Sequence, residues 1–268
     1  MPPVGTDVVV PTAWVLPCCT YQGIVVNIPE LRLYYFRPAP DDPRTTLLTT
    51  YPVGLGRNDR RTPRGKFRVQ SKQVKPTWYI PESIRREHIA ERGDGRRSIP
   101  GGAPDNPLGD YRLQLSRPIY GIHGTDIPWG IGMEATHGCI RLYPEDIERL
   151  FGEVKAGTPV RVVDDEVKLA WIGNDLFMEM YPTKDQSDEI DVDGRLTPVA
   201  PPADLATRVA AAASGQMERI DWSMVHRVAN ERTGVPTRIT AVAQANLPAE
   251  MTPAADETVT PIGSDHPF

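Results

Sequence analysis

A cysteine and two histidines lie within one stretch of small residues near the middle of the chain. The sequence reads Ile-His-Gly-Thr at 122–125 and, after a glycine-rich spacer, Thr-His-Gly-Cys-Ile-Arg-Leu at 136–142. A cysteine attacks a carbonyl group as its thiolate. A free thiol has a pKa near ~8.5, so a nearby base or cation must lower that pKa at neutral pH. These residue types indicate nucleophilic catalysis by Cys139 with a histidine as the base.

Either histidine can supply that base. His137 lies two residues before Cys139, and His123 ends a predicted strand sixteen positions upstream, from which a loop can return to the cysteine. The backbone N–H groups of His137, Gly138 and Cys139 are candidate donors to the oxyanion of a tetrahedral intermediate. Gly138 also allows close approach of a substrate to the backbone.

Two other interpretations of these residues stay open. An isolated cysteine is usually a small buried apolar residue. Alternatively, His123, His137 and Cys139 are zinc ligands. Such a site needs a hydrogen-bond partner for each histidine and a fourth ligand or water, for which no residue stands out. We therefore expect no metal and no cofactor.

The elements that must position these residues are mainly short strands. Runs of β-branched and aromatic residues are bounded by Gly, Pro or Asp, which favours strands joined by turns. The predicted strands are a hairpin at 23–28 and 31–36, then 47–53, 65–74, 110–115, 120–123 and 159–163. Helices are predicted from Pro144 to about Gly157, where apolar residues recur at helical spacing, and at 81–89. We expect a β-rich α+β domain rather than a βαβ array.

After residue 165, the sequence predicts a hairpin and two helices. A second hairpin is predicted at 167–172 and 176–181, and two helices at 204–214 and 222–233, the second N-capped by Asp221. The predicted organisation is an N-terminal extension at 1–22, a catalytic domain at 23–165, a hairpin extension at 166–183, a linker at 184–203, C-terminal helices at 204–239 and a disordered tail at 240–268.

Composition and charge exclude several classes of protein. The 268 residues are 40% apolar and 24% charged, as in ordinary globular proteins. Residues 1–163 hold 22 Lys and Arg against 17 Asp and Glu, and the rest of the chain holds 8 against 18. The first part favours an anionic substrate, but its arginines lack interleaved aromatics, so we expect no nucleic acid. No apolar run reaches the ~18 residues of a membrane span. The adjacent Cys18 and Cys19 define no disulfide framework and receive no role.

At the cysteine and histidine motifs the sequence closely resembles the YkuD-domain L,D-transpeptidases, in particular the ErfK-type branch of Gram-negative bacteria. The family pattern is His-Gly-Thr, a spacer, Ser or Thr-His-Gly-Cys, an aliphatic residue and Arg, and this chain has each element. Further similar segments lie at 51–56, 62–67, 76–78 and 104–109. The resemblance implies a YkuD-like catalytic domain, a mixed β sandwich or bent sheet with few helices. The small C-terminal helical extension is predicted from the sequence pattern instead.

The resemblance also implies a reaction. Cys139 is the implied nucleophile and His123 the implied base, with the Gly124 carbonyl orienting the imidazole and His137 acting through its backbone. The substrate is a peptidoglycan stem tetrapeptide, attacked between its third residue, typically meso-diaminopimelate, and D-Ala. The thioester is then transferred to an amine, either the diaminopimelate of a second stem in a 3-3 cross-link or a lysine of an outer-membrane lipoprotein.

Four further residues are expected to contact substrate. These are Thr125, Trp129, Thr136 and Arg141. Arg141 suits a substrate carboxylate, although a structural ion pair is an equal alternative. Trp129 is alternatively a packing aromatic.

Two alternatives to the transpeptidase remain: a hydrolase, in which water accepts the acyl group, and a protein without catalytic activity. An L,D-carboxypeptidase or amidase-type hydrolase would use the same thioester, and a non-catalytic wall-binding module would keep only the fold. The resemblance implies a carbapenem-sensitive periplasmic enzyme of cell-wall organisation and cell shape. Because the first sixteen residues lack a basic leader and an apolar region, we expect an export signal outside the given sequence.

Overall fold

A computed structural model describes residues 5, 7, 14–17 and 21–241 of the chain, so Cys18, Cys19 and almost all of the predicted tail lie outside the described residues. The strands are β1 (Gly23–Asn27), β2 (Arg32–Pro38), β3 (Thr46–Pro52), β4 (Leu55–Gly56), β5 (Gly65–Val74), β6 (Trp78–Tyr79), β7 (Ser98–Ile99), β8 (Tyr111–Leu115), β9 (Gly121–His123), β10 (Glu134–Thr136), β11 (Ile140–Arg141), β12 (Pro159–Val163), β13 (Val167–Ile172), β14 (Asp175–Met180) and β15 (Thr237–Arg238). The helices are α1 (Glu82–Arg92), α2 (Pro144–Glu153), α3 (Lys184–Asp193), α4 (Leu205–Ala213) and α5 (Trp222–Glu231).

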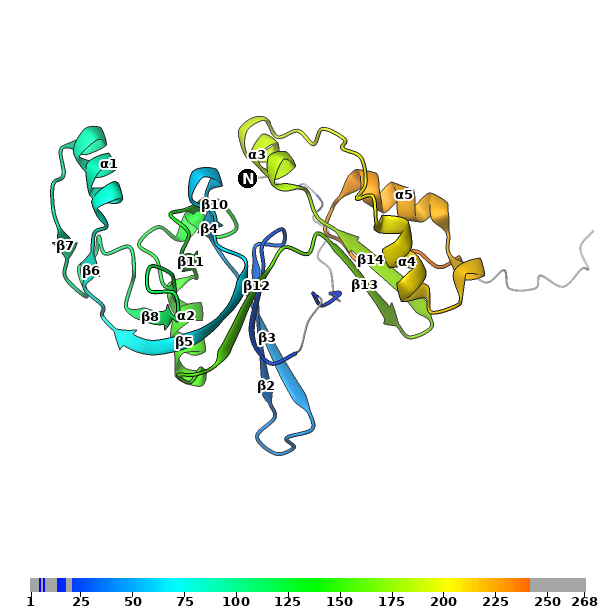
Figure 1. The fold of residues 1–268 in the computed structure, drawn as a ribbon, viewed down its shortest axis with the longest axis horizontal. Helices are drawn as coiled ribbons and strands as arrows, with labels where there is room; N and C mark the ends of the chain where they lie inside the picture. Colours follow the sequence, from blue (N-terminus) through cyan, green and yellow to red (C-terminus); the bar gives the residue numbers. More distant parts are fainter. Residues whose placement is uncertain (1–4, 6, 8–13, 18–20, 242–268) are drawn as a thin grey trace, which may run out of the picture.

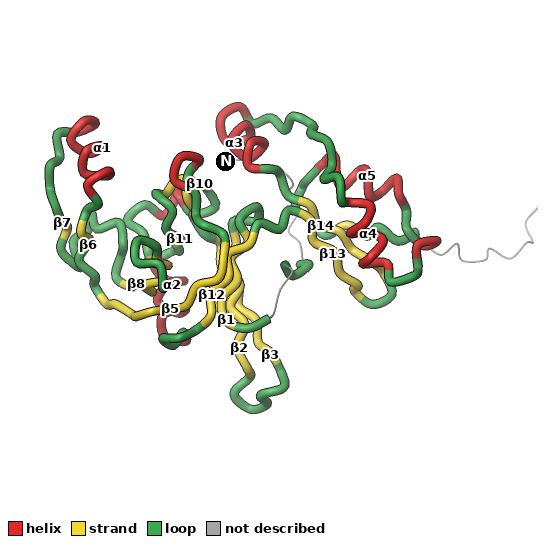
Figure 2. Tube along the Cα trace, viewed as in Figure 1, coloured by secondary structure: helices red, strands yellow, loops and turns green. Residues whose placement is uncertain are grey.

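The catalytic part is built on one strongly bent sheet, which Figures 1 and 2 show curving along β5. Eight strands pair in the order β11-β9-β8-β5-β12-β1-β2-β3. The pairs β1–β12 and β9–β11 are parallel and the others are antiparallel. A register shift between Val69 and Ser71 marks an irregularity in β5, and such bulges bend a strand. The predicted α+β fold with a bent sheet is confirmed.

Helix α2 covers the main core and ends earlier than the sequence suggested. Its Ile147 and Leu150 are buried in the cluster that the sheet forms with Ile122, Leu113 and Ile140. The predicted end was Gly157, but Val154 already has extended backbone, with ψ at 137°, and its side chain is fully buried. The side chain of Val154 thus enters the core from extended backbone after the helix.

The C-terminal hairpin and helices share a second core. Strands β13, β14 and β15 form one sheet, and α4 and α5 pack on it through residues such as Val167, Met178, Val209 and Val225. The two-residue strand β15 was not predicted. We propose that the hairpin and the helices form a single C-terminal unit rather than two separate extensions.

The segment 184–203, predicted to be a linker, contains α3. The helix begins with a capping box, in which Thr183 Oγ1 accepts from Gln186 N–H and the Gln186 side chain accepts from Thr183 N–H. Lys184 then forms an ion pair with Glu134 of β10, at 2.7 Å. An acidic helix stabilised by its cap and by ion pairs lacks the apolar stripe that indicates a helix in a sequence.

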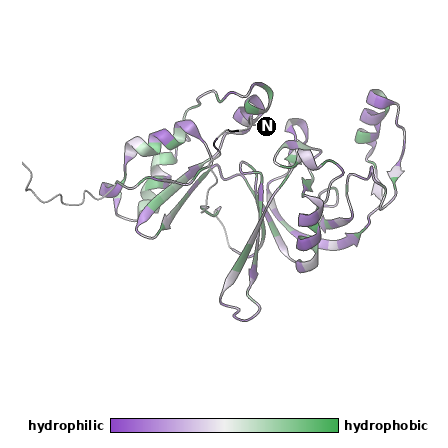
Figure 3. Cartoon of the chain, turned by 180° about the vertical axis from the view of Figure 1, so that it is seen from behind, coloured by the Kyte–Doolittle hydropathy of each residue, from purple (hydrophilic) through white to green (hydrophobic). Residues whose placement is uncertain are grey.

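A small apolar cluster stabilises the segment between β5 and β8. We call residues 76–109, which contain β6, α1 and β7, the flap. Ile80, Ile84 and Ile99 form its core. Figure 3 shows that most of α1 is hydrophilic. Within the described part of the chain, the helices lack the combination of length and apolar character that crossing a membrane requires.

Candidate active site

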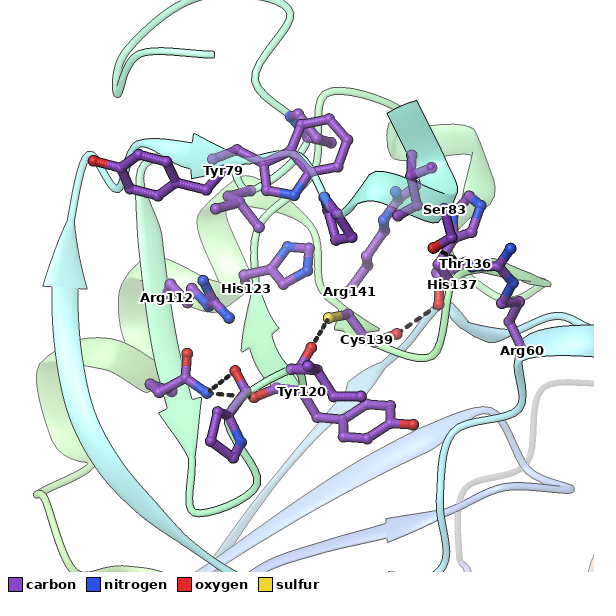
Figure 4. Close-up of a pocket in the computed structure, with 18 of the residues that line it drawn as sticks. Arg60, Tyr79, Ser83, Arg112, Tyr120, His123, Thr136, His137, Cys139 and Arg141 are labelled. Atoms are coloured by element: carbon purple, nitrogen blue, oxygen red, sulfur yellow. Dashed lines mark hydrogen bonds between the residues drawn. The ribbon is translucent and has the colours of Figure 1, made fainter. Parts of the chain in front are cut away.

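The flap and one edge of the bent sheet enclose a cavity of about 720 Å³. Figure 4 shows the His123 ring and the Cys139 sulfur facing this space. The buried Asn106 holds the base of the flap, because its side-chain amide donates to the Pro76 and Pro100 carbonyls at 2.9 and 3.0 Å. The cavity is lined by side chains from both parts, among them Trp78, Tyr79, Ser83, Ile84, Arg112, Gln114, His123, Thr136, His137, Cys139 and Arg141.

Three side chains form a row across the sheet. His123 ends β9, and its cross-strand partners are Arg112 on β8 and Arg141 on β11. Directly paired residues project from the same face of a sheet, so the imidazole lies between two guanidinium groups. Cys139 immediately precedes β11, and the parallel pairing of β11 with β9 brings it beside Gly121, the first residue of β9.

The hydrogen bonding of His123 defines its tautomer. Its Nδ1 lies 2.7 Å from the carbonyl oxygen of Gly124, which only accepts, so Nδ1 carries the proton and Nε2 keeps its lone pair. The side chain is 2% exposed. Burial, followed by the nearby Arg141, lowers the pKa of His123 to about 3, although the Gly124 bond opposes this shift. The imidazole is therefore neutral at pH 7 and suited to accept a proton at Nε2.

Cys139 is an uncharged thiol in these surroundings. It keeps part of its surface exposed, and its Sγ–H donates to the Ile119 carbonyl at 3.7 Å. Burial raises the pKa of the thiol, against the opposing effects of a Gly121 backbone hydrogen bond and of Arg112 and Arg141. Desolvation therefore outweighs the neighbouring cations, and the thiol depends on a base to become a nucleophile.

Gln114 supports the loop that binds the thiol, a role that the sequence analysis missed. Its side-chain amide donates to the Pro118 and Tyr120 carbonyls, both at 2.8 Å, and so holds the loop that carries Ile119. The available signal was its position on a strand between the buried Leu113 and Leu115.

Thr136 lines the cavity and also holds the turn around the cysteine, and its expected contact with substrate stays a prediction. Its hydroxyl donates to the Cys139 carbonyl at 2.7 Å and accepts from Gly138 N–H at 3.1 Å. Because Gly138 N–H is engaged, the predicted oxyanion donors are reduced to the amides of His137 and Cys139. Gly138 has φ at +103°, and a Cβ there would lie 2.8 Å from Tyr120 Cε1.

The imidazole of His137 tethers the flap. Its Nε2–H donates to Glu87 on α1 at 2.9 Å, and Glu87 also pairs with Arg60 at 2.6 Å. The bond from His137, together with Arg60 and Arg57, holds the pKa of Glu87 below its ordinary value. A side chain used in this way is unsuited to act as the base or to share a zinc ion with His123. Among the described residues, no three metal-ligating side chains are grouped.

Two of the expected substrate contacts lie away from the cavity. Thr125 is 5% exposed, and its hydroxyl accepts from Ile127 N–H at 2.9 Å, which closes a turn. Trp129 is 77% exposed, which excludes the alternative of a packing aromatic, and it does not line the cavity, so its contact with substrate stays a prediction.

Arg141 lines the cavity, and Arg112 is a cavity residue that the sequence analysis missed. Within the described part of the chain, neither guanidinium forms an ion pair, and the buried Nε of each has no hydrogen-bond partner. Asp126 influences Arg141 only at a distance. The alternative of a structural ion pair for Arg141 is therefore not supported.

The fold and cavity define an α+β enzyme domain in which a thiol and a buried imidazole face one space. The model of the L,D-transpeptidase catalytic domain, YkuD, matches residues 21–162. The chain is 33% identical to the probable L,D-transpeptidase ErfK/SrfK of Escherichia coli over 244 residues, covering 90% of this chain and 74% of that protein. It is 36% identical to the Salmonella typhimurium protein of the same name, with coverage of 90% and 74%. The chain belongs to the L,D-transpeptidase family, and it is an enzyme of that family, a peptidoglycan L,D-transpeptidase.

Solved structures of L,D-transpeptidases are also similar to parts of the chain. The carbamoyl enzyme formed by Ldtfm and avibactam has a TM-score of 0.40 and 23% identity, covering 55% of this chain and 50% of that one. L,D-transpeptidase 3 from Mycobacterium tuberculosis with a faropenem-derived adduct has a TM-score of 0.39 and 22% identity, covering 54% and 60%.

Proposed function

We propose that Cys139 is the nucleophile and His123 the general base in acyl transfer from a peptidoglycan stem tetrapeptide to an amine. The observation that carries the proposal is the fixed tautomer of His123. Its Nδ1–H is bound to the Gly124 carbonyl, which leaves Nε2 to accept a proton in the cavity that Cys139 lines. This arrangement pairs a nucleophile with an oriented base.

The reaction begins with a neutral thiol and a neutral imidazole. As Cys139 Sγ attacks the carbonyl carbon between diaminopimelate and D-Ala, its proton moves to His123 Nε2. The amides of His137 and Cys139 are the donors proposed for the oxyanion. The imidazolium then protonates the departing amine of D-Ala, which leaves a thioester. In the second half, the acceptor amine attacks the thioester while Nε2 takes a proton from it, and the imidazolium then returns this proton to the departing sulfur, which restores the Cys139 thiol. This is the chemistry of a cysteine acyltransferase that forms a new amide.

The proposal also concerns the amine that accepts the acyl group from the thioester. A diaminopimelate amine of another stem gives a 3-3 cross-link, and a lysine of an outer-membrane lipoprotein gives an anchored protein. Water would give a carboxypeptidase instead. We assign the reaction to the periplasm, where stem peptides and such a lipoprotein meet, and we expect the strained amide of a carbapenem to acylate Cys139.

The test is product analysis by mass spectrometry with purified tetrapeptide muropeptides and a candidate lipoprotein peptide. We expect D-Ala release with a cross-linked dimer or a peptide adduct. Cys139→Ala should abolish release, and His123→Gln should lower it about a hundredfold to ten-thousandfold, as expected for loss of a general base. Release of D-Ala by folded Cys139→Ala protein would reject the assignment, and tripeptide as the sole product would identify a hydrolase.

A further inference from the structure

The cavity contains two guanidinium groups that form no ion pair within the described residues. Arg112 and Arg141 lie on opposite sides of His123, as the strand register requires and as Figure 4 shows. In the described part of the chain, the Nε of each is buried without an acceptor. An unpaired buried donor costs free energy, and burial of an unpaired charge costs more. Such a cost is explained if a bound ligand supplies the missing acceptors.

The absence of a side chain at Gly121 leaves space for the side chain of Arg112. Gly121, on the neighbouring strand, has no side chain, and a Cβ there would lie 2.9 Å from Arg112 Nε. The guanidinium thus packs against bare backbone beside the reacting cysteine. The stem of Arg112 is half-buried between Gly121 and the cavity, which restricts where its charged group can go.

We propose that Arg112 binds a carboxylate of the acyl donor and that Arg141 binds a second one on the other side of His123. This inference rests on the proposed function, which provides a donor with two carboxylates near the scissile bond: the terminal carboxylate of D-Ala and the side-chain carboxylate of diaminopimelate. A guanidinium recognises a carboxylate through two parallel hydrogen bonds, which a carboxamide cannot reproduce. Arg112 therefore makes the enzyme selective for donors whose carboxylates are not amidated.

Donor binding on both arginines also favours the chemistry. The two cations oppose protonation of His123, whose pKa is lowered chiefly by burial and next by Arg141. Carboxylates placed beside the guanidinium groups offset that effect. His123 thus becomes a stronger base when an anionic donor is bound.

The binding test uses the Cys139→Ala protein, in which no reaction occurs. Isothermal titration would compare three synthetic tetrapeptides: one with both carboxylates free, one with a D-Ala carboxamide and one with a diaminopimelate side-chain carboxamide. Adding Arg112→Gln should weaken binding of the free donor about tenfold to a hundredfold, as for loss of a charge-assisted bidentate contact. It should leave one amidated donor unaffected, and that donor identifies the carboxylate that Arg112 binds.

Controls separate this role from a structural one. Arg68→Gln removes the same charge from an exposed position on β5 outside the cavity lining, and it should leave the binding of all three donors unchanged. Arg112→Gln should not lower the melting temperature, because Arg112 Nε has no internal partner to lose. Arg112→Lys keeps the charge without the bidentate geometry and should recover only part of the affinity.

Two results would overturn the inference: equal weakening for all three donors, or no weakening for any. Its failure is distinct from failure of the proposed function, which is read from D-Ala release by protein that retains Cys139. Absence of release, with donor-specific binding intact, would remove only the proposed reaction. Release of D-Ala without donor-specific binding would reject only the role proposed for Arg112.

Discussion

Cys139 and His123 share a cavity whose surroundings oppose charge on both side chains. Burial raises the pKa of the thiol and is the main cause that lowers the pKa of His123 to about 3. A preformed thiolate–imidazolium pair would need a lowered pKa of the thiol and a raised pKa of His123. In the proposed reaction, the proton would therefore move to His123 during attack.

This neutral pair predicts a particular pH dependence of alkylation. Because the thiol pKa lies above its ordinary value, the thiolate fraction at pH 6–8 is small and rises about tenfold per pH unit. The rate of Cys139 alkylation by iodoacetamide, followed by intact mass, should rise in the same way with no plateau in this range. A plateau beginning near pH 5 that disappears in His123→Gln would instead reveal an ion pair.

Gly138 has a conformational role that another residue cannot take. Its φ is +103°, and a Cβ would lie 2.8 Å from Tyr120 Cε1 and 3.2 Å from the Arg60 carbonyl oxygen. We expect Gly138→Ala to lower the free energy of unfolding by about 1–3 kcal/mol and to reduce D-Ala release more than tenfold, because the turn before Cys139 must move. Kinetics and urea denaturation would measure both effects.

Helix α2 provides the matched control for that substitution. A Cβ at Gly152 would meet no atom within 4 Å. Gly152→Ala should therefore be neutral or stabilising by up to about 1 kcal/mol. Equal behaviour of the two variants would contradict the role assigned to Gly138.

At the scale of elements, the flap is held to the catalytic motif through one carboxylate. Glu87 of α1 accepts from His137 at 2.9 Å and pairs with Arg60 at 2.6 Å and with Arg57 at 3.4 Å. His137 lies two residues from Cys139, so flap position and nucleophile position are physically linked.

Removing the charge of Glu87 should loosen the flap without unfolding the domain. Partly exposed ion pairs contribute up to about 1 kcal/mol each, so Glu87→Gln should speed hydrogen exchange of α1 amides about fivefold or more. Hydrogen exchange with mass spectrometry over 82–92 measures this. Glu91→Gln, at an exposed position of the same helix, is the control and should leave exchange unchanged. Unchanged exchange in both variants would show that Glu87 does not restrain the flap.

At the scale of the whole molecule, a buried charge cluster joins the catalytic part to the C-terminal unit. Lys168 of β13 is fully buried and pairs with Glu30, between β1 and β2, at 2.7 Å and with Glu179 of β14 at 2.5 Å. The hydroxyl of Tyr181 donates to both carboxylates, at 3.2 and 3.0 Å, and that of Tyr34 donates to Glu30. The cluster thus fixes the C-terminal unit against the sheet.

Breaking this cluster should be costly to stability. Lys168→Met leaves two buried carboxylates without their cation, and such losses amount to about 3–5 kcal/mol in the free energy of unfolding. Urea denaturation would measure it, with the exposed Lys155→Met as a control expected within about 0.5 kcal/mol of the parent. Combining Lys168→Met with Glu30→Gln and Glu179→Gln should recover part of the loss. A loss below about 1 kcal/mol for Lys168→Met alone would contradict the structural role.

Local signals in the sequence determined much of this protein. Runs of β-branched and aromatic residues bounded by turn formers predicted the strands of the bent sheet to within two residues, because strand and turn preferences act over a few residues. The exception is the two-residue β11, which was not predicted. The motif at 136–142 identified Cys139 and Arg141 as cavity residues for the same reason, since its members are neighbours in the chain. The polar helix α3 was missed because a capping box and ion pairs, rather than an apolar stripe, stabilise it.

Only the tertiary structure decided which side chains share the cavity and in what charge state. Arg112 reaches His123 through strand pairing, Glu87 reaches His137 across fifty positions, and Thr125 and Trp129 are directed away from the site. Burial, which depends on every element packed around a group, made the thiol and the imidazole neutral. Sequence spacing carries no measure of desolvation or of contact between distant strands, and these two quantities determine the chemistry of the cavity.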